Sequence, residues 1–163
     1  MVNLKIDVSC RGGGGEAQCI FKLNNDHVTK LVMALPQLEF LLLGRPCSNN
    51  TCATTVACLL PISVHCVGLQ ELKIHFNATN IVDDFKNIPD DSRLRDLRPL
   101  PRCRLVRLDI HEMPLNFDEP GFETVVTGMI DIFPSLELYE GVEGNFDWEE
   151  VSERLTELQG VDV

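Results

Sequence analysis

A short leucine pattern, Leu-x-x-Leu-x-Leu, recurs along the chain and restricts the fold more than any other sequence feature. Three clear copies begin at Leu38, Leu69 and Leu105, and weaker copies begin at Met1 and Leu136. Successive copies start roughly 30 to 40 residues apart, an interval typical of solenoid proteins, in which stacked repeats bury a common core. The sequence therefore predicts one domain of about five units. These units are 1–37, 38–68, 69–104, 105–135 and 136–163.

Each unit is expected to contain one strand and one helix. The last two apolar positions of each clear copy lie two residues apart, which is the spacing of a strand with one buried face. The clearest helix is predicted between Phe122 and Phe133, where apolar residues recur at helical spacing and Pro134 follows. Strands that alternate with helices are expected to be parallel, because parallel strands need a crossover connection. The predicted architecture is an α/β solenoid with a curved parallel sheet on the concave side and helices on the convex side.

The other predicted helices are less regular. Asp26 is expected to cap the first helix. A second helix is expected over 54–66, where Pro61 should kink or shorten it. The third unit has room for a short helix over 81–88, and the last helix should begin with a capping box at 147–150. The residues predicted to face inward from the first, second and last of these helices are Val28, Leu31, Val32 and Leu35; Val56, Leu59, Leu60 and Val64; and Trp148, Val151, Leu155 and Leu158.

Composition bears on the partners of such an array. The 14 basic and 25 acidic residues give a formal net charge of −11, which disfavours nucleic acids and anionic membrane surfaces. No apolar run is long enough to cross a bilayer, and no secretory signal is recognised, so cytoplasm or nucleus is the expected location. The seven cysteines are an odd number with irregular spacings, and no secretory signal is recognised, so they are predicted to be reduced, with Cys58 and Cys66 in the core. They also lack the Cys-x-x-Cys pair that is typical of zinc sites. No metal or other cofactor is expected.

Three segments, 35–44, 68–76 and 132–137, carry a resemblance to a known family. They read Leu-Pro-Gln-Leu-Glu-Phe-Leu-Leu-Leu-Gly, Gly-Leu-Gln-Glu-Leu-Lys-Ile-His-Phe and Ile-Phe-Pro-Ser-Leu-Glu. These residues resemble the leucine-rich-repeat regions of F-box-type proteins from mushroom-forming fungi. The resemblance implies a leucine-rich-repeat fold over nearly the whole chain, and repeats that hold a substrate while an F-box docks on the Skp-type adaptor of a ubiquitin ligase. Because no F-box segment is found, the chain is expected to be a fragment of a longer protein or to have a different role.

Stacking the units in register predicts which side chains become neighbours on the concave side. Equivalent positions on adjacent strands lie about 4.8 Å apart. The third and fourth units would then pair Glu71 with Arg107, and Lys73 with Asp109. These two opposite-charge matches favour this register, although each exposed pair should contribute less than about 1 kcal/mol to stability.

Other features of the same face have competing interpretations. His75 would lie beside His111, which could indicate a metal or acid–base site, although exposed histidines on a sheet are more common. Phe40 and Leu42 are apolar at solvent-facing positions, so they could contact a partner or be covered by another segment of the chain. The sequence contains no nucleophile elbow or phosphate-binding loop, and the acidic pair at 83–84 is expected in a solvated loop.

The sequence thus predicts a protein-interaction module rather than an enzyme. In its specific form this would be the substrate-recognition region of an F-box-type ubiquitin-ligase adaptor, and a Skp-type adaptor would bind only if an F-box exists outside this chain. The alternatives are a metal-binding or hydrolytic domain centred on His75 and His111, or a remnant repeat array without independent activity. The predicted partner-binding residues are Phe40, Leu42, Glu71, Lys73, His75, Arg107, Asp109 and His111.

Overall fold

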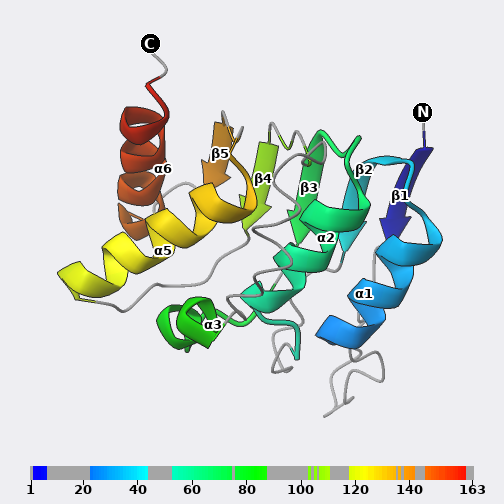
Figure 1. Cartoon of the computed structure of the whole chain (residues 1–163), viewed down its shortest axis with the longest axis horizontal. Helices are drawn as coiled ribbons and strands as arrows, with labels where there is room; N and C mark the ends of the chain where they lie inside the picture. The colour runs from blue at the N-terminus through cyan, green and yellow to red at the C-terminus, as the bar shows by residue number, and fades with distance from the viewer. Residues whose placement is uncertain are drawn as a thin grey trace, which may run out of the picture.

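In the part of the chain that the structure describes, five short strands form one sheet, and every neighbouring pair of strands is parallel (Figure 1). The strands are β1 (Val2–Ile6), β2 (Leu38–Leu43), β3 (Glu71–Ile74), β4 (Arg107–Ile110) and β5 (Leu138–Gly141). They follow one another across the sheet in the same order as along the chain. This computed structural model describes residues 2–6, 23–43, 53–74, 76–87, 103, 105, 107–110, 118–134, 136, 138–141 and 146–160. The predicted α/β class and parallel sheet are confirmed.

Each strand lies on a copy of the leucine pattern. Strand β2 occupies all of its copy, whereas β3 and β4 begin two residues after the first leucine of theirs. Those first leucines, Leu69 and Leu105, are nevertheless fully buried. Each of these leucines therefore anchors the chain in the core two residues before its strand begins, and the prediction that the three clear copies form adjacent parallel strands is confirmed.

A layer of helices accompanies the sheet. It comprises α1 (Asn25–Ala34), the 3₁₀ turn η1 (Val56–Cys58), α2 (Leu59–His65), α3 (Ile81–Asn87), α5 (Glu119–Ile132) and α6 (Phe146–Gln159). In Figure 1, α1, α2 and α5 cross the near face of the sheet, and α6 stands beside β5. Helices α1 and α2 contact each other, as do α3 and α5, and α5 and α6.

The core fills the space between the sheet and the helices. The inward positions of the strands are buried: Leu41, Leu43, Leu72, Ile74 and Leu108. They form one cluster with residues of α1, α2 and α5, namely Val28, Val32, Leu59, Ile62, Val125, Val126 and Met129. The predicted inward side of β2, β3 and β4 is confirmed at these positions, and the side chain of Ile110 lies outside the described residues.

A second row of backbone pairing joins the residues just before the helices. Asn24 forms a parallel bridge with Ala53, and Thr55 forms one with Asn77. The Asn25 side chain accepts the backbone N–H of Thr55 at 2.9 Å and donates to Thr55 Oγ1 at 3.1 Å. The first three units are therefore joined at two levels, in the sheet and at the helix starts.

The caps predicted for the first and last helices were wrong. Helix α1 is capped by Asn24, whose side chain accepts the backbone N–H of His27 at 2.9 Å, and Asp26 lies inside the first turn. Helix α6 begins at Phe146, so Asp147 lies inside the helix rather than at its N-cap. Asp and Asn both suit an N-cap, and residue preference alone could not select between two such neighbours.

Some inward-facing predictions were also wrong. Val64 is 37% exposed and Leu60 is only partly buried, whereas Ile62 is fully buried. The cause is η1, because a 3₁₀ turn has about three residues per turn and shifts the phase of the helix that follows. Leu158 is 49% exposed near the end of α6. The predicted inward side of α5, which ends at Ile132 before Pro134, is confirmed at Val125, Val126 and Met129. The side chain of Trp148 lies outside the described residues.

Candidate functional site

The sheet has one side without α1, α2 and α5, which we call the open face. Because strand side chains alternate, Phe40 and Leu42 lie on this side when Leu41 and Leu43 are buried against the helices. The same alternation places Glu71 and Lys73 of β3 and Arg107 of β4 on the open face. These five residues belong to the predicted partner-binding set.

The strand register pairs Cα positions of adjacent strands in two rows. The first row runs Asn3, Phe40, Glu71, Arg107 and Leu138, and the second runs Lys5, Leu42, Lys73, Asp109 and Glu140. The side chains of Asp109, Leu138 and Glu140 lie outside the described residues. The Cα pairs Glu71–Arg107 and Lys73–Asp109 are those predicted from the leucine pattern. Within strand β3, Lys73 Nζ lies 3.8 Å from Glu71 Oε1, so opposite charges interact along this strand.

The apolar part of the open face lies on β2. Phe40 and Leu42 are partly buried, not fully exposed as the sequence suggested. The neighbouring charged side chains are similar, since Lys73 is 32% and Glu71 30% exposed. Side chains on one face of a sheet shield one another, because neighbouring strands are only about 4.8 Å apart. The open face is therefore a closely spaced surface that still has accessible apolar and charged groups.

The sequence analysis missed the part of this face that lies on β1. Asn3 pairs with Phe40, and Lys5 pairs with Leu42. Both β1 residues are exposed. The weak copy of the leucine pattern that begins at Met1 contained this signal, because Asn3 and Lys5 occupy the template positions of Phe40 and Leu42. Lys5 adds a cation on one side of the apolar pair.

The histidine pair lies outside the described residues. Neither His75 nor His111 can be placed on the open face, and the side chain of Asp109 is likewise not described. Within the part of the chain that the structure describes, no group of three or more His, Cys, Asp or Glu residues could hold a metal ion.

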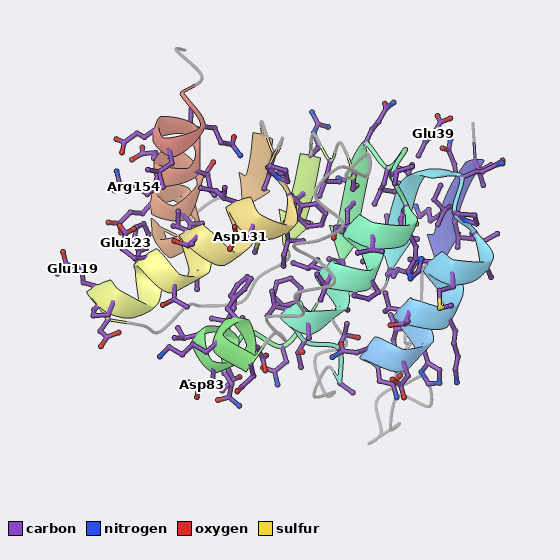
Figure 2. All side chains as sticks on the ribbon, in the orientation of Figure 1. Glu39, Asp83, Glu119, Glu123, Asp131 and Arg154 are labelled. Atoms are coloured by element: carbon purple, nitrogen blue, oxygen red, sulfur yellow. The ribbon has the colours of Figure 1, made fainter. Side chains whose placement is uncertain are left out.

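The helix side has a different character. Exposed acids are spread over α3 and α5, including Asp83, Glu119, Glu123 and Asp131 (Figure 2). Arg154 of α6 lies 3.5 Å from Glu123 and 2.9 Å from Glu157, and these acids raise the pKa of its guanidinium. The acids are separated along the helices and show no convergence that would form a site.

The acidic pair at the start of α3 lies in a helix, not in a loop as predicted. Asp83 and Asp84 occupy the first turn, where the helix dipole favours negative charge. Burial raises the pKa of Asp84, and the neighbouring Asp83 carboxylate raises it further, while a hydrogen bond with Thr55 opposes both effects. This contact links α3 to the residue that precedes η1, so the role of Asp84 is to join units.

Three described cysteines, Cys58, Cys66 and Cys103, form no disulfide bond and are fully buried. Burial raises the pKa of Cys66 to about 11 and that of Cys103 to about 12. A thiol with so high a pKa is a poor nucleophile at neutral pH, because the thiolate is the reactive form. The predicted core positions of Cys58 and Cys66 are confirmed, and burial makes Cys66 and Cys103 poor candidates for a nucleophile.

Comparison of the chain with protein-family models, with curated proteins and with solved structures finds no match. No helix in the described part of the chain is long and apolar enough to cross a membrane.

Proposed function

We propose that the chain is a protein-interaction module rather than an enzyme, and that the open face binds another protein. One observation carries the proposal. The register places the apolar pair Phe40 and Leu42 directly beside the charged residues of β3, on the side of the sheet that α1, α2 and α5 leave uncovered. Protein interfaces combine apolar anchors with charged surroundings in this way.

We also propose that the fold is a leucine-rich-repeat solenoid. Support comes from the identical order of strands in the sheet and in the chain. The bridges from Asn24 to Ala53 and from Thr55 to Asn77 add support, because a second ladder at equivalent places is expected when similar units stack. In such an array the open face would be the concave side, and the helices would form the convex side.

The chemistry of the face suggests the chemistry of the partner. The apolar pair on β2 has Lys5 on one side and Glu71 with Lys73 on the other. A partner segment with an apolar side chain over β2, an acid towards β1 and mixed charges towards β3 would complement this arrangement. Apolar contact would supply most of the affinity, and the charges would determine specificity and association rate.

In its specific form, the proposed role is substrate recognition for an F-box-type ubiquitin-ligase adaptor in the cytoplasm or nucleus. The support is the resemblance of segments 35–44, 68–76 and 132–137. A Skp-type adaptor would bind only through an F-box outside this chain. Nucleic acid is a poor candidate partner, because the net charge of −11 opposes contact with phosphates.

The proposal can be tested by capture with matched charge reversals. Arg107→Glu changes the open face, and Lys30→Glu makes the same charge change on exposed α1. Quantitative mass spectrometry should identify a protein that wild type and Lys30→Glu retain and Arg107→Glu loses. Titration calorimetry with that purified protein should then give at least about tenfold weaker binding for Arg107→Glu. Equal capture and equal affinity for the two variants would contradict the proposal.

A further inference from the structure

A second surface feature lies at the edge of the sheet where β1, β2 and β3 begin. It is a shallow depression of about 460 Å³, separate from the open-face rows. Val2, Pro36 and Val67 supply its apolar lining. Gln37, Glu39 and Gln70 supply its polar groups. Val2 and Val67 are 37% and 41% exposed, so the apolar lining is accessible to a ligand.

The backbone at Glu39 is irregular, and this affects where its side chain lies. Val2 pairs with Leu38 and Asn3 pairs with Phe40, so Glu39 is an extra residue in the ladder between β1 and β2. Such bulges change the direction of a side chain and are common at sheet edges and functional sites. Glu39 lies at the strand-start edge in Figure 2.

The residue just before β3, Gln70, is a second polar residue at the same place. The backbone N–H of Gln70 donates to the carbonyl of Glu39 at 2.9 Å. Gln70 is exposed, and it lines the depression together with Glu39. The described lining thus combines one residue that has a carboxylate and two that have side-chain amides with three apolar residues.

We infer that this depression binds an arginine side chain of another protein. The arginine methylenes would pack on Val2, Pro36 and Val67, as long basic side chains pack on apolar surface while their charged group stays in water. The planar guanidinium has five N–H donors, which suit a carboxylate and neighbouring amide oxygens. An ammonium group has three donors at one point and fits this spread of acceptors less well.

Charge complementarity supports the same occupant. Among the described residues that line the depression, Glu39 is the one with a charged side chain, and the whole chain carries a net charge of −11. A negative protein attracts basic partners and raises their rate of encounter. An acidic ligand would meet both the Glu39 carboxylate and the general negative charge. This inference does not rest on the proposed role of the open face, so the two can fail independently.

Nuclear magnetic resonance titration tests the inference with defined probes. The full ¹⁵N-labelled chain would be titrated with the capped tripeptide Gly-Arg-Gly and with matched Gly-citrulline-Gly and Gly-Lys-Gly peptides. The arginine peptide should shift the amide signals of Gln37, Glu39, Val67 and Gln70, with a dissociation constant on the order of 1 mM. The citrulline peptide, which has the same shape without the charge, should bind about tenfold more weakly, and the lysine peptide should fall between them.

Two substitutions complete the test. Glu39→Gln should weaken the arginine peptide about tenfold, whereas Glu119→Gln on exposed α5 should leave its affinity unchanged. If Glu39→Gln disturbs the spectrum as a whole, Val67→Lys provides the same comparison by placing a cation in the depression. Equal binding of the arginine and citrulline peptides, or shifts that avoid these four residues, would overturn the inference. If free arginine bound more tightly than the capped peptide, this would contradict the inference that the occupant is a side chain of another protein.

Discussion

At the scale of single residues, close packing between α3 and α5 depends on one glycine. A Cβ atom added at Gly128 would lie 2.3 Å from Cδ1 of Phe85, far inside normal contact distance. Phe85 is 8% exposed and belongs to the core cluster, so its ring has little freedom to move away. Gly128 therefore lets α5 approach the aromatic ring of α3.

The first prediction is that Gly128→Ala destabilises the protein by about 1–3 kcal/mol, as overpacking does. Gly68→Ala is the matched control, because its added Cβ would meet Leu38 O at an ordinary 3.8 Å. Denaturant unfolding of both variants measures the difference in free energy of unfolding. An equal effect of the two substitutions would contradict the proposed role of Gly128.

Buried thiols also connect neighbouring units at the residue scale. Cys66 Sγ donates to Leu35 O at 3.7 Å, and Cys103 Sγ donates to Leu69 O at 3.5 Å. Each thiol reaches a carbonyl that lies more than thirty positions earlier in the chain. The neutral thiol makes these contacts, and burial disfavours its ionisation.

The second prediction concerns stability at alkaline pH. The pKa of Cys103 is about 12 in the folded protein, against an ordinary value of 9.0, so the unfolded chain loses this proton first as the pH rises. The contribution of the buried Cys103 thiol to the free energy of unfolding is therefore complete below pH 9 and is lost progressively up to about pH 12. Between neutral pH and about pH 10, the free energy of unfolding of wild type should fall by about 1 kcal/mol more than that of Cys103→Ala. Urea unfolding over this pH range measures the difference, and parallel curves would contradict it.

At the scale of secondary structure, the start of α1 depends on one side chain that the sequence analysis did not select. Asn24 caps the helix and also forms the bridge to Ala53. Asp26 lies in the first turn, where it interacts with the helix dipole. The cap and the ladder between units therefore meet at the same residue.

The third prediction separates these two residues. Asn24→Ala should lower the free energy of unfolding by about 1 kcal/mol, because it removes the acceptor for His27 N–H. Asp26→Ala should cost about 0.5 kcal/mol, since it weakens only the interaction with the dipole. Thermal or urea unfolding provides the comparison. A larger loss from Asp26→Ala would indicate that the sequence-based choice of cap was right.

The elements differ in how well the sequence predicts them, for physical reasons. Helix α5 has fourteen residues, a consistent apolar face and Pro134 behind it, so periodicity alone locates its inward side. The inward side of α2 could not be located in this way, because η1 precedes α2 and interrupts the 3.6-residue period. Short turns depend on local hydrogen bonds, such as that from Ala57 N–H to Thr55 Oγ1, which periodicity does not contain.

At the scale of the whole molecule, the leucine pattern predicts both the order and the register of the strands. Because strand side chains alternate between the two faces, two strands can shift relative to each other only by an even number of residues without exposing core side chains. The position of the leucine pattern in each unit selects one of these registers. The Cα pairs Glu71–Arg107 and Lys73–Asp109 follow from this. The depression at the strand starts could not be predicted, because it depends on the bulge at Glu39 and on residues from three separate segments of the chain.

The claim that the open face binds a protein can be tested most directly by methyl nuclear magnetic resonance of the chain with the partner that Arg107→Glu fails to capture. Leu42 reports on the open face, while Leu41 and Leu43 on the same strand face the core. Met33 and Val64 are 58% and 37% exposed and report on α1 and α2. The account predicts that the partner shifts or broadens the Leu42 methyl signals and leaves those of Met33 and Val64 unchanged. Changes at Met33 and Val64 with an unaffected Leu42 would contradict it.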